Sequence, residues 1–171
     1  MTPPLDAQVH SRDDTDIVIA VVILASRATA ADHEVVAAMV ESARTLAAYV
    51  VVVLPKGWRA PPRSRVAHVA PGAPAIGAIR AGMAQLSNTP APYALLWPLD
   101  AGVVDVARLR RLVDDVAREQ SAVGAFAEDD LDHAPVLIAR DAWLDLMTLG
   151  EGGIGAVAAR RGVHRVAADA T

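Results

Sequence analysis

The chain has no cysteine in its 171 residues and few aromatic side chains, which make up 4% of the total. Disulfides, thiolate nucleophiles and cysteine-based metal sites are therefore excluded. No apolar run approaches the roughly 18 residues of a membrane-spanning helix, so we expect no membrane association. The net charge of −4 lacks the basic excess that a nucleic-acid surface needs, so we expect no nucleic-acid partner.

Apolar residues, 53% of the chain, follow two alternating patterns. Short runs rich in valine, isoleucine and leucine predict strands at residues 17–25, 49–54, 65–69, 94–97, 122–126, 136–138 and 163–167. Apolar residues at helical spacing predict helices at residues 35–46, 76–86, 106–116, 141–149 and 156–161, with Asp32 as the N-cap of the first. This alternation predicts a three-layer α/β/α, Rossmann-like domain with a mostly parallel sheet.

The first 16 residues have a different character, with prolines, mixed charges and no periodicity. We expect residues 1–16 to form a disordered tail and residues 17–171 to form a single domain. The tail lacks the basic start and apolar stretch of a secretory signal, so a cytoplasmic bacterial protein is expected.

The stretch at residues 93–102 contains the most informative carboxylate. A buried strand runs into Pro98, Asp100 and Gly102, and a helical pattern follows. Ligands of open α/β sheets bind outside the carboxyl ends of the strands, which makes Asp100 a candidate for functional chemistry. The alternative is that Asp100 only opens a turn before the helix.

Ser26 and Arg27 follow the first predicted strand, where the loop before the first helix of such folds binds phosphate. The alternative is an ordinary surface loop, because glycine is absent. A GxGxxG pattern at residues 150–155 follows a helix, not a strand, and therefore fails as a dinucleotide fingerprint. No two of the five histidines have the i, i+4 spacing of zinc ligands.

Three segments carry a resemblance to a known family. Residues 72–83 are similar to a glycine-led helix that ends in an R-A-G-L/M run, and residues 94–100 to a strand that ends at a metal-binding aspartate. The segment from His133 to Leu137 resembles a G-H-P-V motif. Across residues 17–169 the chain resembles the MobA-like nucleotidyltransferases, the molybdenum-cofactor cytidylyl- and guanylyltransferases, whose fold is nucleotide-diphospho-sugar transferase-like.

Such enzymes join CTP or GTP to a phosphorylated acceptor and release pyrophosphate, with Mg²⁺ offsetting the phosphate charge. The resemblance implies a metal site at Asp100 and Asp169 and a substrate-side role for His133. It also implies a set of nucleotide-binding residues: Ala25, Ser26, Arg27, Arg80 and Gly82.

The first loop departs from the family pattern L-A-A-G-x-S-x-R-x-G-x-x-K. Residues 24–33 lack both glycines and the lysine, and Asp169 is a stand-in for an aspartate in a D-I-D-T-P stretch. Ala134 also separates the usual His-Pro pair. Phosphoryl transfer depends on positioning and charge, so these losses should cost many kcal/mol of transition-state stabilisation.

The leading hypothesis is a degenerate, non-catalytic or weakly active nucleotide-binding or regulatory relative. It would work with a protein partner such as an oxidoreductase or a cofactor-assembly system. The rival is an active Mg²⁺-dependent nucleotidyltransferase that uses Asp100 and Asp169. A third hypothesis is a homo-oligomeric structural or interaction protein.

Overall fold

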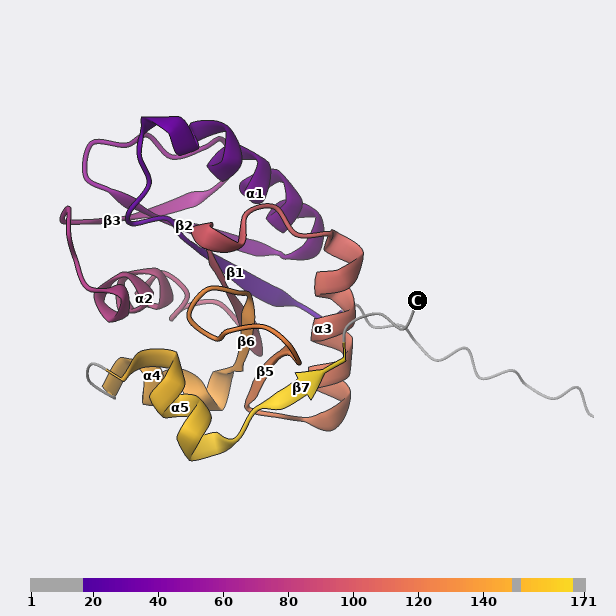
Figure 1. Cartoon of the computed structure of the whole chain (residues 1–171). Helices are drawn as coiled ribbons and strands as arrows, with labels where there is room; N and C mark the ends of the chain where they lie inside the picture. Colours follow the sequence, from indigo (N-terminus) through magenta and orange to yellow (C-terminus); the bar gives the residue numbers. More distant parts are fainter. Residues whose placement is uncertain (1–16, 149–151, 168–171) are drawn as a thin grey trace, which may run out of the picture.

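The computed structural model describes residues 17–148 and 152–167 (Figure 1). The tail expected at residues 1–16, part of the glycine-rich turn (residues 149–151) and Asp169 lie outside the described residues.

The fold is built on a seven-stranded sheet of order β3-β2-β1-β4-β6-β5-β7. The sequence predicted each strand to within two residues at either end. The observed bounds are β1 Ile19–Leu24, β2 Tyr49–Pro55, β3 Arg65–Val69, β4 Tyr93–Pro98, β5 Val123–Phe126, β6 Val136–Ala139 and β7 His164–Val166.

The expectation of a mostly parallel sheet is only partly right. The pairs β1–β2, β1–β4, β2–β3 and β5–β7 are parallel, whereas β6 is antiparallel to both β4 and β5. A parallel crossover needs a dozen or more residues, usually including a helix. Only nine residues separate β5 from β6, so the chain turns back and β6 runs in the opposite direction.

Helices cover both faces of the sheet and confirm the three layers (Figure 1). One face carries α1 His33–Leu46 and α3 Val106–Glu119; the other carries α2 Ala75–Ala84, α4 Trp143–Thr148 and α5 Gly153–Arg161. Three 3₁₀ turns complete the set: η1 Ala30–Asp32, η2 Leu99–Ala101 and η3 Arg140–Ala142. The helix expected from residue 141 is therefore divided into η3 and α4. Within the described ranges, no helix is long and apolar enough to cross a membrane.

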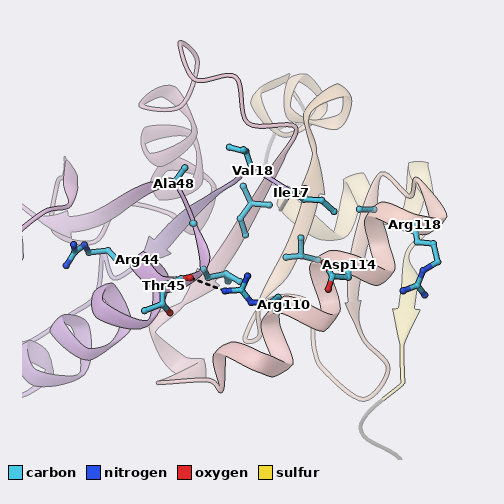
Figure 2. Close-up of a pocket in the computed structure, with 13 residues that line it drawn as sticks. Ile17, Val18, Arg44, Thr45, Ala48, Arg110, Asp114 and Arg118 are labelled. Carbon is cyan, nitrogen blue, oxygen red and sulfur yellow. Dashed lines mark hydrogen bonds between the residues drawn. The ribbon is translucent and has the colours of Figure 1, made fainter. Parts of the chain in front are cut away.

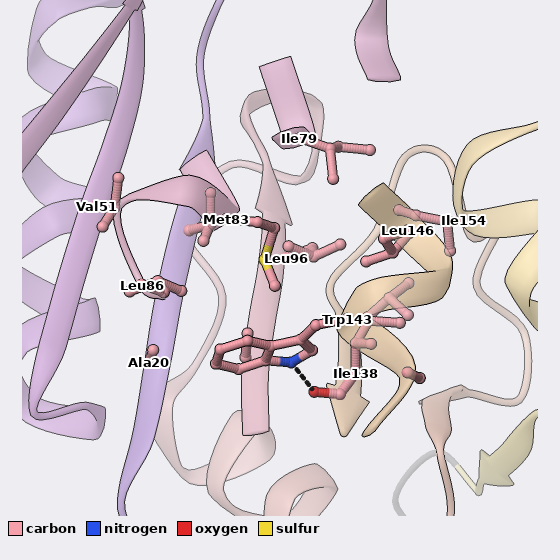
Figure 3. Packing of buried hydrophobic residues seen from close by; sticks show 14 of the residues in the cluster. Ala20, Val51, Ile79, Met83, Leu86, Leu96, Ile138, Trp143, Leu146 and Ile154 are labelled. Carbon is pink, nitrogen blue, oxygen red and sulfur yellow. Dashed lines mark hydrogen bonds between the residues drawn. The ribbon is translucent and has the colours of Figure 1, made fainter. Parts of the chain in front are cut away.

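Both faces of the sheet are buried, which explains why its strands read as continuous apolar runs. Along β1, Ile19, Val21 and Ile23 pack toward α1 and α3, while Ala20 and Val22 belong to the cluster under α2, α4 and α5. Figure 3 shows this second cluster, in which the indole N–H of Trp143 donates to the Ile138 carbonyl at 3.1 Å.

Gly82 lets α2 approach the sheet closely. A Cβ atom at this position would lie 2.4 Å from Cγ1 of Val22 and 2.9 Å from Cγ2 of Val53. Neither valine can give way easily, because both are β-branched residues within central strands. Gly77, on the same helix, has room: its nearest neighbours would be Pro74 ring atoms at 3.8 Å.

We expect Gly82→Ala to lower the free energy of unfolding by about 1–3 kcal/mol, because the added methyl overpacks the contact with Val22 and Val53. Gly77→Ala is the matched control and should raise it by up to about 1 kcal/mol through helix propensity. Urea unfolding followed by circular dichroism measures both. Equal effects from the two substitutions would show that close packing at Gly82 is not the cause.

Candidate functional site

A cleft of about 660 Å³ lies where β1 and β4 end, and we call it the carboxyl-edge cleft. Its walls come from the β1–α1 loop, the start of α2, η2, the β5–β6 loop and the start of α5. The polar and charged side chains that line it are Ser26, Arg27, Asp32, Asp100, Asp132 and His133. The cleft therefore lies at the sheet edge where ligands of α/β folds bind.

Asp100 is held at the rim by a turn that the buried end of β4 stabilises. The indole N–H of Trp97, which is fully buried, donates to the Gly102 carbonyl at 2.9 Å. The Gly102 N–H in turn donates to the Leu99 carbonyl at 2.9 Å, and its φ of 61° suits glycine. Asp100 thus both belongs to a turn and lines the cleft, so the two sequence interpretations are compatible.

His133 reaches Asp100 from the β5–β6 loop. Its Nδ1 lies 2.9 Å from Oδ2 of Asp100, and both side chains are largely exposed. The hydrogen bond to the Asp100 carboxylate raises the pKa of His133. Desolvation opposes this shift, and the negative charges of Asp130, Asp100 and Asp132 add to it. The two residues are 33 positions apart in the chain, so the contact joins the turn after β4 to the β5–β6 loop.

The β1–α1 loop contributes Ser26 and Arg27 to the cleft, as the sequence predicts. The loop has no glycine and folds into η1, where the carboxylate of Asp32 accepts a hydrogen bond from the Thr29 N–H at 2.7 Å. Asp32 is the N-cap residue of α1, but its side chain points back to Thr29 and not forward to the helix.

Three other predicted residues, all within the described ranges, do not line this cleft. Ala25 is buried in the core beside α1, and Gly82 faces Val22 and Val53 in the sheet. Arg80 lies half-buried on α2. The sequence reasoning missed Asp32 and Asp132 as cleft residues, although each lies in a loop that follows a predicted strand.

The metal-binding capacity of the cleft rests on Asp100. Within residues 17–148 and 152–167, no three histidine or carboxylate side chains are grouped so as to hold a metal ion. Mg²⁺ usually keeps several waters and takes one or two carboxylates together with substrate phosphates. The oxygen donor of Asp100 therefore fits a Mg²⁺ ion that arrives with a nucleotide and does not form a complete site alone.

A second cleft, of about 710 Å³, lies at the opposite end of β1, between the C-terminal part of α1 and α3 (Figure 2). Its three arginines have partners within the chain: Arg44 pairs with Glu41, Arg118 pairs with Asp115, and Arg110 donates to the Thr45 carbonyl. The arginines of this cleft are thus already engaged, and the cleft is remote from the strand ends that carry Asp100 and Ser26.

No protein-family model matches the chain, and no curated protein matches it in sequence. Solved structures do match. Rv0371c of Mycobacterium tuberculosis H37Rv, in complex with manganese, is 22% identical with a TM-score of 0.66, covering 92% of this chain and 91% of that one. A homolog of Rv0371c from Mycobacterium sp. strain JC1 is 17% identical with a TM-score of 0.68, covering 91% and 87%.

The 2-C-methyl-D-erythritol 4-phosphate cytidylyltransferase of Thermus thermophilus is also similar. It is 17% identical with a TM-score of 0.61, and the match covers 90% of each chain. At these identities the likeness concerns the fold. The chain thus has the α/β fold of nucleotidyltransferases, which confirms the coarser part of the sequence resemblance; the link to molybdenum-cofactor enzymes stays a prediction.

The His133–Asp100 contact predicts a pH-dependent pair. We expect the pKa of His133 to lie above the ordinary histidine value of about 6.5 and to fall toward it in Asp100→Asn. Because the folded-state pKa of His133 is raised, the ion pair is present while the imidazole is protonated and the carboxylate is ionised, and it is lost as the pH rises through the pKa of His133. NMR titration of the imidazole protons measures both values, with His68 as an internal reference outside the cleft. A His133 pKa unchanged by Asp100→Asn would contradict the contact.

Proposed function

We propose that this chain is a nucleotide-binding domain of the nucleotidyltransferase fold with little or no transferase activity. One observation carries the proposal. The carboxyl-edge cleft brings together Ser26, Arg27, Asp100 and His133, yet the loop that should hold the phosphates is closed on itself through Asp32. The site keeps a ligand pocket and lacks the groups that phosphoryl transfer requires.

The cleft has the size and lining of a nucleotide pocket. Its volume of about 660 Å³ lies within the usual range of small-molecule sites, about 300–1,000 Å³. Ile76, Ile79 and Leu99 supply apolar surface for a base or sugar, and Arg27 supplies a cation for a phosphate. This combination favours a ligand with one flat apolar part and one anionic part.

We attribute the weak transferase activity of this proposal to phosphate-binding groups that the sequence lacks. Each lost donor to the developing charge costs about 10²–10³ in rate, and here two loop glycines and a lysine are absent. Lys56, the only lysine in the sequence, follows β2 and does not line the cleft. Mg²⁺, held by Asp100 and the nucleotide's phosphates, would supply charge neutralisation and would not replace those donors.

The rival proposal is an active Mg²⁺-dependent transferase with a phosphorylated acceptor. The exposed Asp100 carboxylate at the end of β4 favours it, because a single carboxylate can anchor the metal of a nucleotide complex. The manganese of the Rv0371c structure and the cytidylyltransferase from Thermus thermophilus support a divalent cation and CTP as the first probes.

Calorimetric titration with CTP and with GTP, each with and without Mg²⁺, separates the two proposals. We expect one of the nucleotides to bind with a Kd of about 0.1–1 mM, because several charge-assisted hydrogen bonds to phosphate, worth roughly 1.5–3 kcal/mol each, are missing. Mg²⁺ should tighten binding by no more than about threefold, and Asp100→Ala should remove that small effect.

Asp114→Ala is the matched control, since this exposed aspartate lines the opposite cleft. Micromolar, metal-dependent binding that is lost in Asp100→Ala and kept in Asp114→Ala would favour the active enzyme. Absence of binding at about 10 mM nucleotide, well above the expected Kd, would overturn nucleotide binding altogether.

The homo-oligomer hypothesis stays a prediction. Leu144 is 68% exposed on α4, which leaves an apolar side chain available to a second copy or a protein partner. Light scattering at several concentrations tests it, and a strict monomer would remove the option of a homo-oligomer.

A further inference from the structure

We propose that the β3 edge of the sheet is a docking surface for an acidic, extended segment of a partner protein. The surface consists of four exposed cations on β3 and on the connection that precedes it, and we call it the basic edge: Lys56, Arg59, Arg63 and Arg65. None of these four described residues lines the carboxyl-edge cleft. The basic edge is therefore a second surface, independent of the nucleotide pocket.

The sequence gives this part of the molecule no compensating negative charge. No aspartate or glutamate occurs between Glu41 and Asp100, although the chain as a whole carries a net charge of −4. The elements β2, β3 and α2 lie within this acid-free range, and β3 is the outermost strand at one end of the sheet (Figure 1). Surfaces of soluble domains usually mix charges of both signs, so a region of one sign indicates an electrostatic role.

The cations of the basic edge have no carboxylate partner in the part of the chain that the structure describes. Lys56, Arg59 and Arg63 form no ion pair with any described residue. Arg65 donates to the Gln85 carbonyl at 3.3 Å, a neutral partner that leaves its charge uncompensated. By contrast, α3 and α5 carry arginines that pair with aspartates. An acidic partner would supply the counter-charge that the chain lacks at this surface.

The β2–β3 connection presents its cations from a backbone that is held in place. Trp58 stacks on the imidazole of His33 with ring centroids 4.0 Å apart, and its carbonyl lies 2.8 Å from Nε2 of His68 on β3. Further along the connection, the Ser64 hydroxyl donates to the Pro61 carbonyl at 2.7 Å. A surface that is already ordered loses little conformational entropy on binding, which favours a docking role.

The open edge of β3 indicates the form of the partner. β3 pairs with β2 and has no second neighbour among the described strands. Its outer backbone N–H and C=O groups can therefore pair with a strand from another chain, as in β-strand addition. An extended peptide with acidic side chains satisfies both these backbone groups and the cations, whereas a nucleic acid satisfies only the cations.

Charge on an edge strand also protects a sheet against aggregation, and the positions of the cations argue against that role alone. Of the four, only Arg65 lies on β3 itself. The other three lie on the connection between Pro55 and Arg65. Protection of the edge requires charge on the strand, so three cations on the connection call for another explanation.

Fluorescence anisotropy with labelled peptides of about eight residues tests the docking surface on the full chain. The probe alternates glutamate with valine. One comparison peptide replaces glutamate by lysine, and another replaces valine by proline, which keeps the charge and removes alternate backbone N–H donors. At low salt we expect the glutamate–valine peptide to bind about tenfold more tightly than the lysine–valine peptide and about fivefold more tightly than the glutamate–proline peptide.

The triple substitution Lys56→Gln, Arg59→Gln and Arg63→Asn removes three cations that have no ion-pair partner, and asparagine suits the φ of 62° at position 63. It should weaken binding of the glutamate–valine peptide by about tenfold, roughly twofold for each exposed ion pair lost. The matched control replaces by glutamine three exposed arginines of α3 and α5, and it should change the Kd by less than about twofold because these charges are screened at a distance. Its positions are Arg110, Arg118 and Arg160.

Circular dichroism and thermal unfolding confirm that both triple variants are folded. Equal weakening by the two variants would show that only net charge matters and would overturn the docking surface. Equal affinity for the two acidic peptides would overturn strand addition, and no binding of the glutamate–valine peptide at about 1 mM would overturn the whole proposal. Tighter binding of an oligothymidylate of the same length would make this a nucleic-acid surface instead.

Light scattering of the same samples separates the remaining alternatives. Aggregation of the basic-edge variant with unchanged peptide binding would reassign the cations to protection of the edge. Self-association of the wild type that this variant abolishes would make the occupant a second copy of the chain and would overturn a separate acidic partner. A monomeric wild type and a monomeric variant with weakened peptide binding are the expected results.

Discussion

The parallel pairing of β1 with β4 decides where ligand chemistry can occur on this chain. Leu24 is in register with Pro98, so the two strands end at the same level. The residues that follow them, Ser26 and Arg27 on one side and Asp100 on the other, therefore meet at one edge of the sheet. The remaining residues that line the cleft come from the start of α2, the β5–β6 loop and the start of α5.

The local chemistry of the β1–α1 loop then limits what that edge can do. A glycine-rich loop leaves its amides free and can approach a phosphate closely. Here residues 26–31 contain no glycine, and the Thr29 N–H donates to the carboxylate of Asp32 within η1.

Much of this arrangement could be predicted from the sequence, because burial on both faces of a sheet forces apolar runs and a helical face forces regular spacing. The strand predicted at residues 94–97, observed as Tyr93–Pro98, and the position of Asp100 after it followed from that pattern. The direction of β6 could not be predicted in this way, because an apolar run has the same pattern in either direction. The short connection from β5 determines that β6 runs antiparallel to β5. The contact of Asp32 with Thr29 could not be predicted either, because an N-cap aspartate can turn its side chain forward or back with the same sequence.

Gly82, in the R-A-G-M run at residues 80–83, is a packing residue of α2. A nucleotide contact at Gly82 stays a prediction; in the fold, Gly82 lets α2 pack closely onto Val22 and Val53. The first turn of the same helix carries Ile76, which lines the cleft. Because a helix moves as a rigid unit over ten residues, the distance set at Gly82 also sets how far that first turn lies from the sheet. The close packing at Gly82 thus belongs to the same helix whose first turn lines the cleft.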